Sequence, residues 1–361
     1  MALPLPAVPP LPGVLPLEQA WLKLVQTEVE ASLQELFELP DEAGFDARWA
    51  EAMEQVRAYT LRPAKRVRPA LVMAGHCLAR GTPVVPSELW RFAAGLELLH
   101  TFLLIHDDVA DQAEARRGGA ALHRLLAPGR QGEDLAVVMG DHLFSRALEA
   151  MLESGLPGVA RVVRYYLAVC RHTAAGQYLD LSLGHAPLAE VSLFQALRVA
   201  SLKTARYGFC APLVCGAMLG GGGDALREEL ERVGRHVGMA YQLRDDLIGL
   251  FGDSAVAGKA ADGDFVQGKR TFPVLAAFAR ATPQAREELE ALWALPAAAK
   301  DARALARARA LVEEHGGRAA CERMVERASR TARRALQSLP NPNGVRDLLD
   351  ALIARLAQRA S

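Results

Sequence analysis

The sequence has few aromatic residues, no paired cysteines and no excess of either charge. Aromatic residues make up 6% of its 361 positions. The five cysteines are odd in number, scattered along the chain, and form no CxxC pair. This usage argues against a disulfide framework and predicts free thiols in a reducing compartment, which we take to be the cytoplasm. Lys plus Arg and Asp plus Glu balance at 42 each, so net charge does not draw the whole chain towards nucleic acid or anionic lipid.

Long apolar runs and alternating patterns are also missing. No run reaches the length of a membrane-spanning helix, so we expect no transmembrane segment. No stretch alternates between apolar and polar residues as a half-buried strand does. Residues 1–16 are apolar, but six prolines interrupt them and they lack the basic start of a signal peptide. We therefore expect a Pro-rich, flexible arm over residues 1–16.

The composition that remains favours helices. Hydrophobic residues make up 51% of the chain, and Ala, Leu and Arg dominate it. Helical periodicity and turn-forming breaks predict helices over residues 17–38, 44–59, 66–80, 87–113, 131–153, 158–183, 189–207, 209–220, 223–250, 273–281, 283–294, 300–315, 317–338 and 343–359. No long linker and no solenoid repeat divides them. We predict a single all-α domain over residues 17–361, with outer helices around a central bundle.

The segment 97–117, ELLHTFLLIHDDVADQAEARR, holds the first candidate site. At helical spacing, one stripe of it contains His100, Leu103, Asp107 and Asp111. Carboxylates one turn apart repel each other unless a cation lies between them, and Arg116 and Arg117 follow closely. Oxygen ligands beside arginines indicate a magnesium–phosphate site. A DDxxD alone, however, is more commonly a solvated helix end.

A basic segment precedes this stripe. Residues 62–69 read RPAKRVRP, in which Lys65 and Arg68 are three positions apart. We expect both side chains to point the same way at a helix start, where Pro69 is tolerated. Two cations beside the free N–H groups of a helix N-terminus favour an anion site. The alternative is a solvated basic turn.

Two further segments place polar residues inside apolar helices. Gln177 and Asp180 lie in one of them, and Lys203 and Thr204 lie in another. Buried polar groups need partners, so the first pair belongs either to a satisfied core network or to the lining of a cavity. An uncompensated ammonium is costly in a core, so we expect Lys203 to face a polar cavity.

A second acidic turn ends the apolar segment that contains Gln242. Asp245 and Asp246 begin this turn, but the position four residues after Asp245 is Gly249. A glycine-rich loop with Lys259, Lys269 and Arg270 follows, and lysines on such a loop suit a lid over phosphates. Two carboxylate clusters can hold Mg²⁺ ions that bind a diphosphate. The chemistry that this favours is ionisation of a diphosphate ester.

The motifs occur in one order over residues 60–275: KRxRP, LLH…DDxxD…RR, GQ..D, KT and YQ..DD..G.FGD…GK…GKRT. In this order and spacing the chain resembles the trans-isoprenyl diphosphate synthases, or polyprenyl synthetases, most closely the short-chain geranylgeranyl and farnesyl diphosphate synthases. Residues 280–361 match only as generic helices. The resemblance implies mostly antiparallel helices around a deep central cavity, a homodimer, and two acidic motifs that face each other. It also implies head-to-tail, trans condensation of isopentenyl diphosphate with an allylic diphosphate.

The resemblance also implies a role for each motif residue, with about three Mg²⁺ ions per active site. The implied metal ligands are Asp107, Asp108, Asp111, Asp245 and Asp246. The implied contacts to the allylic diphosphate are Arg116, Lys203, Thr204, Gln242, Lys259 and Lys269. The implied isopentenyl diphosphate pocket consists of Lys65, Arg68, His100 and Arg117. The candidate catalytic residues are Lys203, Thr204 and Gln242, of which the last two would stabilise the allylic cation.

The chain departs from the family pattern in three places. Ala64 replaces a glycine that often precedes KRxRP, and Gly249 replaces the third aspartate of the second motif. The first motif lacks the two-residue insertion of many bacterial short-chain members.

Phe102 and Leu103 lie one to two turns before Asp107, where a bulky side chain would close the product tunnel early. With the uninserted motif, this favours a geranylgeranyl over a farnesyl product, although Phe102 fits ordinary core packing nearly as well.

Other classes of protein fit less well. A di-iron bundle needs two ExxH motifs, and the sequence has one, at Glu97–His100. The histidines lack the spacing of a metal phosphohydrolase, and a terpene cyclase would not need the Lys65 and Arg68 cations. The remaining alternative is a non-catalytic or regulatory subunit of a prenyl synthase complex, although such subunits typically lose the aspartates that this chain keeps.

Overall fold

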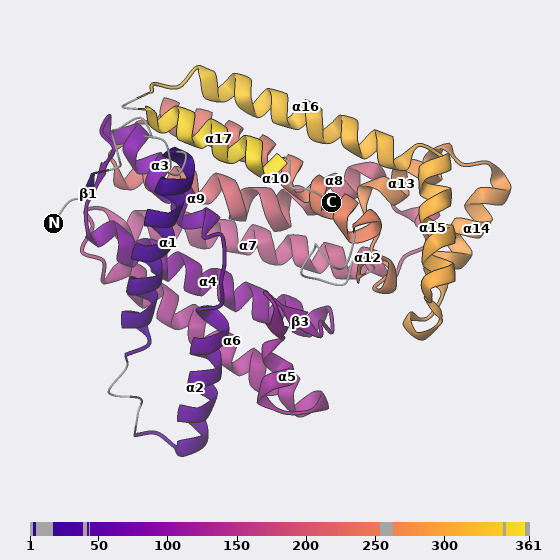
Figure 1. Cartoon of the computed structure of the whole chain (residues 1–361), viewed down its shortest axis with the longest axis horizontal. Coiled ribbons are helices and arrows are strands. Elements are labelled where there is room, and N and C mark those ends of the chain that lie inside the picture. The colour runs from indigo at the N-terminus through magenta and orange to yellow at the C-terminus, as the bar shows by residue number, and fades with distance from the viewer. Residues whose placement is uncertain are drawn as a thin grey trace, which may run out of the picture. The chain divides into compact units, whose positions relative to one another are not determined.

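The computed structural model describes residues 3–4, 17–38, 42, 44–252, 263–341 and 344–357. Helices account for most of these residues, as Figure 1 shows, which confirms the all-α prediction. No helix in this part of the chain is both long and apolar enough to cross a membrane. The chain groups into two compact units, which are described one at a time. The single-domain boundary at residues 17–361 stays a prediction.

The first unit contains residues 1–165, 212–223 and 341–348. Its helices are α1 (Leu17–Leu36), α2 (Ala47–Thr60), α3 (Val67–Arg80), α4 (Glu88–Ala110), α5 (Leu122–Leu126), α6 (Gly129–Leu152) and most of α9 (Ala211–Leu219). In α1 the fully buried Trp21, Val25, Val29 and Leu33 recur every four residues and form one apolar stripe. Helix α4 packs against both α1 and α6, so it is buried around most of its circumference.

Two short antiparallel strand pairs occur in this unit, although the sequence pattern predicts no strands. Strand β1 (Leu3–Pro4) pairs with β2 (Val84–Val85), and β3 (Ala115–Arg116) pairs with β4 (Gly119–Ala120). Each strand has two residues, which is too short for apolar–polar alternation to be visible in the sequence. The first pair places two residues of the expected flexible arm in a strand; the rest of the arm lies outside the described residues.

The second unit contains residues 166–211, 224–340 and 349–361. Its elements are the 3₁₀-helix η1 (Leu188–Glu190), α8 (Leu193–Val199), the π-helix η2 (Ala200–Cys210), α10 (Asp224–Phe251), α12 (Gly263–Val266), α13 (Phe272–Arg280), α14 (Pro283–Ala294), the 3₁₀-helix η3 (Ala297–Ala299), α15 (Ala302–Glu314) and α16 (Gly317–Gln337). Helices α7 (Val159–Gly184) and α17 (Val345–Ala357) contribute residues to both units. Helix α10 packs against α16 and η2, and its Leu243 and Leu247 are buried with Cys321 and Val325.

The prediction of one continuous helix over residues 189–207 is wrong, because η1, α8 and η2 occupy this range. Ser192 starts α8 with a capping box, in which its side chain and that of Gln195 satisfy each other's backbone N–H groups. The helix then widens at Ala200 into an eleven-residue π-helix. Regular π-helix is rare and often occurs at functional sites, and here it carries Lys203 and Thr204.

All five cysteines are free, and four of them are buried. Burial raises the pKa of the Cys77, Cys170 and Cys210 thiols to about 12. At neutral pH these thiols are therefore protonated and behave as small apolar groups.

Candidate functional site

The backbone before α3 takes an unusual conformation around the predicted basic motif. Lys65 lies in the loop before the helix, and only Arg68 lies within its first turn. The expectation that both residues share a helix start is therefore correct for Arg68 alone. Between them, Arg66 has a φ of 45°, in the left-handed region that non-glycine residues seldom adopt. Such strain persists only where surrounding contacts hold it.

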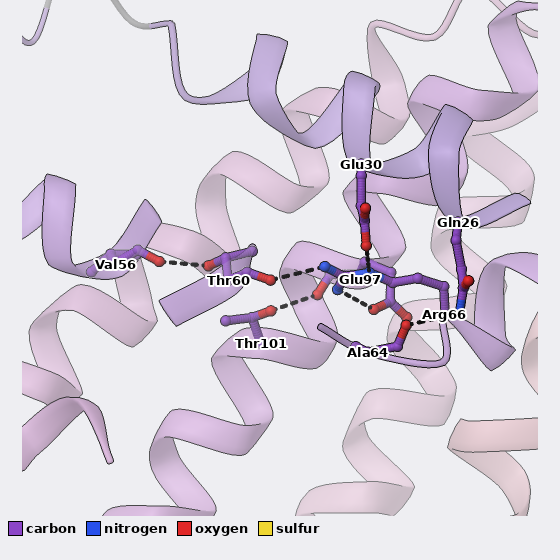
Figure 2. Close-up of polar contacts among 8 residues, drawn as sticks. All are labelled: Gln26, Glu30, Val56, Thr60, Ala64, Arg66, Glu97 and Thr101. Atoms are coloured by element: carbon purple, nitrogen blue, oxygen red, sulfur yellow. Dashed lines mark hydrogen bonds and ion pairs between the residues drawn. The ribbon is translucent and has the colours of Figure 1, made fainter. Parts of the chain in front are cut away.

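A buried polar network holds this loop, as Figure 2 shows. The Arg66 guanidinium donates to Oε2 of Glu97 at 3.0 Å and to the Thr60 carbonyl at 3.0 Å. It also lies 3.6 Å from a carboxylate oxygen of Glu30. On the other side of Lys65, the Gln26 amide donates to the Ala64 carbonyl at 3.1 Å. These contacts fix the backbone on both sides of Lys65, because each joins the loop to α1, α2 or α4.

The sequence pattern predicts no role for Arg66, and it indicates Glu97 only as part of an ExxH motif. Both residues are almost fully buried, at 2% and 1% exposure. The available signal was the charge of Glu97 within the apolar stretch FAAGLELL, because a buried carboxylate requires a cationic partner. Its partner is 31 residues away in the sequence, so the pairing emerges only from the fold.

The acidic turn at the end of α4 separates its three aspartates by burial. Asp108 is completely buried, whereas Asp107 and Asp111 are partly exposed. The Asp108 carboxylate accepts from the Tyr59 hydroxyl at 2.8 Å and from Nε of Arg116 at 2.7 Å, with a second, shorter contact to the same guanidinium. Burial and the Asp108 charge both raise the pKa of the Tyr59 hydroxyl, so Tyr59 stays a donor. Both Asp108 oxygens thus bind protein donors.

The two arginines after the acidic turn lie on a tight hairpin. Arg117 and Gly118 link β3 to β4 and both have positive φ, at 50° and 76°. Positive φ at both central residues is typical of the type I′ turn that joins two-residue hairpins. The Arg62 guanidinium fixes this hairpin by donating to the carbonyls of Arg116 at 2.9 Å and Ala120 at 2.8 Å.

Three of the four residues of the predicted isopentenyl diphosphate pocket influence one another electrostatically. The pKa of His100 is well below its ordinary value because of burial and the nearby positive charges of Arg68 and Arg117. His100 is therefore neutral at physiological pH. Burial also lowers the pKa of Arg117, whose Nη1 is buried and makes no hydrogen bond within the described part of the chain. Arginines gathered around a neutral histidine favour an anionic ligand.

In the second unit, the predicted catalytic residues form hydrogen-bonded pairs. Nζ of Lys203 donates to Oδ2 of Asp180 at 2.8 Å, so the carboxylate of Asp180 compensates the Lys203 charge. The Thr204 hydroxyl donates to the Gln242 amide oxygen at 2.5 Å, and the Gln242 amide nitrogen donates to Asp246 at 2.9 Å. These two hydrogen bonds link η2 to the second acidic turn on α10.

The second acidic turn also contains one buried and one more accessible aspartate. Asp246 is 8% exposed, and its Oδ2 accepts from the backbone N–H of Phe272 at 3.4 Å. Burial and the nearby charge of Asp264 raise the pKa of Asp246 to about 7. Asp245 is partly exposed. Each acidic turn therefore pairs an internally bonded aspartate with a more accessible neighbour.

Two of the three predicted loop cations, Lys269 and Arg270, lie among the described residues. Lys259 lies outside the described residues. Lys269 is partly exposed, and its carbonyl accepts from the Trp293 indole at 3.1 Å. Arg270 donates Nε to the Ala186 carbonyl at 2.8 Å and also donates to the Gly268 carbonyl, so it stabilises the loop's own backbone.

The predicted chain-length residue Phe102 packs between α4 and α6. Its ring centroid lies 4.6 Å from that of His106 and 5.3 Å from that of Phe144. Phe102 and its neighbour Leu103 are both partly buried. These contacts form an aromatic cluster around Phe102, which lies five residues before Asp107.

The donor set fits magnesium held jointly by protein and ligand. Among the described residues, no three His, Cys, Asp or Glu side chains gather into a metal site of their own. Mg²⁺ commonly binds one or two carboxylates, retains several waters and completes its shell with phosphate oxygens. The partly exposed Asp107, Asp111 and Asp245 suit that mode better than Asp108 and Asp246, whose oxygens are already engaged.

The chain is similar to known proteins over most of its length. The Polyprenyl synthetase family model matches residues 50–311. A short-chain isoprenyl diphosphate synthase of Methanothermobacter thermautotrophicus is 34% identical over 68% of this chain and 75% of the relative. A geranylgeranyl diphosphate synthase of Mycobacterium tuberculosis is 34% identical over 87% of this chain and 85% of the relative.

Solved structures agree with the sequence comparisons. A geranylgeranyl pyrophosphate synthase of Corynebacterium glutamicum, crystallised with isoprenyl diphosphate and magnesium, has a TM-score of 0.85 and 29% identity. The match covers 96% of this chain and 100% of that one. The family model and the two relatives at 34% identity each span most of this sequence. The chain therefore belongs to the polyprenyl synthetase family.

Proposed function

We propose that the chain is a Mg²⁺-dependent prenyltransferase that joins isopentenyl diphosphate head-to-tail, in trans, to an allylic diphosphate. The observation that carries the proposal is the group of Arg68, His100 and Arg117 in a member of the polyprenyl synthetase family. A second diphosphate needs its own cationic pocket, and these residues come from the first turn of α3, from α4 and from the β3–β4 hairpin. The relatives named above catalyse or bind isoprenyl diphosphates according to their names, which supports the same substrate class here.

In this proposal, Lys65, Arg68, His100 and Arg117 bind isopentenyl diphosphate. Support comes from the buried Nη1 of Arg117, which has no hydrogen-bond partner among the described residues. A diphosphate oxygen would satisfy it with a charge-assisted hydrogen bond. The neutral His100 can donate one ring N–H without adding another positive charge to the crowded pocket.

Asp107 and Asp111 in the first unit, and Asp245 in the second, act as the main Mg²⁺ ligands in this proposal. Asp108 and Asp246 are assigned a supporting role, because protein donors occupy their carboxylates. Bound Mg²⁺ supplies the positive charge that makes the diphosphate a good leaving group. Asp108 holds the Arg116 guanidinium, which lies 3.8 Å from Asp107, so that its charge can assist an allylic diphosphate.

The remaining predicted contacts to the allylic diphosphate are Lys203, Thr204, Gln242, Lys259 and Lys269. Lys203 can bind a diphosphate oxygen with a second N–H while it keeps its bond to Asp180. The Thr204–Gln242 pair presents oxygen dipoles that can stabilise the allylic cation after the diphosphate leaves. Attack by the double bond of isopentenyl diphosphate then forms the new carbon–carbon bond, and the departing diphosphate accepts the proton.

We further propose geranylgeranyl diphosphate as the favoured product over farnesyl diphosphate. Phe102 supports a short product, because it lies one to two turns before Asp107 and its ring packs against those of His106 and Phe144. A homodimer is supported by the exposed Leu135 and Val138 on α6, at 41% and 56% exposure. The five free cysteines support residence in the reducing cytoplasm.

Product analysis tests this proposal. The protein is incubated with Mg²⁺, isopentenyl diphosphate and, separately, dimethylallyl, geranyl or farnesyl diphosphate, and the product length is determined. A discrete C20 product is the expected result, and a C15 product would contradict only the length assignment. No product with any primer, from a folded protein, would contradict the catalytic proposal and favour a non-catalytic or regulatory subunit.

A further inference from the structure

A small pocket of about 130 Å³ lies between α7 and the junction of α8 with η2. Its lining consists of His172 from α7, Arg198 from the last turn of α8, and Ser201, Leu202 and Arg206 from η2. These five residues supply two guanidinium groups, one imidazole and one hydroxyl, and none of them is acidic. None of them belongs to the motif residues to which the proposed function assigns a role. The pocket is therefore a cationic feature of the chain that the proposed reaction leaves unexplained.

The π-helix brings the η2 side chains of this pocket together. Hydrogen bonds in a π-helix join residues five apart, whereas those in an α-helix join residues four apart. Ser201 and Arg206 are five apart, so in η2 they lie roughly one turn from each other and point to nearly the same side. In an α-helix the same spacing would separate them by about 140° around the axis. The change of helix type at Ala200 thus gathers polar groups that a continuous α-helix would spread out.

A close crossing of α7 and η2 places His172 beside Arg206. A Cβ on Gly176 would lie 2.6 Å from the backbone nitrogen of Lys203 and 3.0 Å from the carbonyl carbon of Leu202, so a side chain there would push the two helices apart. His172 lies one turn before Gly176, and its Nδ1 is 3.2 Å from Nη1 of Arg206. A guanidinium only donates hydrogen bonds, so Nδ1 accepts and Nε2 is the ring nitrogen that can donate to a ligand.

The two arginines of the pocket lack acidic partners. Arg198 is exposed and Arg206 is partly buried, and neither forms an ion pair with a carboxylate in the described part of the chain. The carboxylate of Asp180, two turns beyond His172 on α7, is bonded to Lys203 instead. Positive groups around one small pocket repel each other, and an anion between them would replace this repulsion with attraction.

We propose that the pocket formed by His172, Arg198, Ser201 and Arg206 binds a phosphate group. Each guanidinium can donate two parallel hydrogen bonds to phosphate oxygens, and the Ser201 hydroxyl and Nε2 of His172 add two further donors. A volume of about 130 Å³ is well below the roughly 300–1,000 Å³ of pockets that hold larger organic ligands, which suits a small anion. The phosphate comes either from free inorganic phosphate or from the headgroup of an anionic lipid, and the experiment distinguishes these two sources.

The first part of the test is calorimetric titration of the full chain with inorganic phosphate in the presence of a metal chelator. The proteins compared are the wild type, Arg198→Gln and Arg206→Gln. Arg171→Gln is the matched control, because this exposed arginine precedes His172 on α7 but does not line the pocket. Phosphate that binds to the cations around His100 would appear equally in all four proteins. Circular dichroism checks that each variant folds.

Arg198→Gln and Arg206→Gln should each weaken phosphate binding at one site by about 10- to 100-fold, because each removes a charge-assisted hydrogen bond. Arg171→Gln should bind phosphate as the wild type does. In the second part, each protein is sedimented with vesicles of phosphatidylcholine, alone or mixed with phosphatidic acid. Vesicle binding that requires phosphatidic acid and is weakened in Arg206→Gln would identify a lipid headgroup as the source of the phosphate.

Two results would overturn the proposal. The first is that neither inorganic phosphate nor phosphatidic acid binds more weakly to Arg198→Gln and Arg206→Gln than to the wild type. The second is an equal loss of binding in Arg171→Gln, because the effect would then be one of net charge. Neither part of the test uses prenyl substrates or Mg²⁺, so its outcome is independent of the proposed function.

Discussion

Replacement of Glu97 by alanine leaves the buried Arg66 guanidinium without its principal partner. The two side chains are 1% and 0% exposed, and their closest atoms are 3.0 Å apart. Removing one member of a buried ion pair costs about 3–5 kcal/mol of unfolding free energy. Arg66 would keep the Thr60 carbonyl and Glu30, whose side chain is 38% exposed. We therefore expect the lower end of that range, about 3 kcal/mol.

The assay is urea unfolding of the metal-free protein, followed by helical circular dichroism. The double variant Arg66→Met/Glu97→Leu replaces both charges with apolar groups, and we expect it to lie within about 1–2 kcal/mol of the wild type. Glu153→Ala is the matched control, since it breaks an exposed pair with Arg91 that has a contact of 2.6 Å. Exposed pairs contribute about 0–1 kcal/mol, so this control should have little effect.

Glu97→Ala should also alter substrate binding, because Arg66 holds the backbone between Lys65 and Arg68. We expect the KM for isopentenyl diphosphate to rise in Glu97→Ala, while the KM for the allylic substrate changes less. A loss of stability below about 1 kcal/mol, together with an unchanged KM for isopentenyl diphosphate, would refute two claims. One is that the Arg66–Glu97 ion pair stabilises the fold, and the other is that it positions the loop around Lys65.

Two further predictions concern a buried histidine and the aromatic cluster near Asp107. Burial lowers the pKa of His76 to about 4, so the folded state binds fewer protons than the unfolded state. The contribution of neutral His76 to the free energy of unfolding is complete above pH 6.5. It falls by about 1.4 kcal/mol per pH unit as the pH drops towards 4. Urea titrations at several pH values should show that His76→Gln removes this slope, and an equal slope in the variant would contradict the assignment. Phe102→Ala should lengthen the product if its ring closes the tunnel, whereas chromatography showing an unchanged product length would assign the ring to core packing alone.

The sequence was sufficient to predict most helices, because their apolar periodicity and breaks are local properties. Helix α14 spans residues 283–294 as predicted, where Thr282 caps it and Pro283 begins it. The region from Leu188 to Cys210 was predicted less well. A capping box interrupts the helix there, and a π-helix forms that no local propensity distinguishes from an α-helix.

Pairings over long sequence distances were beyond the reach of the sequence pattern. The Arg66–Glu97 and Lys203–Asp180 pairs join residues 31 and 23 positions apart, and either partner alone fits several environments. The Arg117–Gly118 hairpin was missed because a type I′ turn places a non-glycine residue at positive φ.

The most direct test of the account measures turnover in Asp107→Asn and Asp245→Asn beside the wild type, with saturating Mg²⁺ and both substrates. Each variant removes one accessible carboxylate charge and keeps the shape of the side chain, so circular dichroism should show unchanged helicity. If both acidic motifs hold the metal ions that activate the allylic diphosphate, each variant should lose at least about a hundredfold in rate. Turnover near that of the wild type in either variant would contradict the assignment of that motif to catalysis.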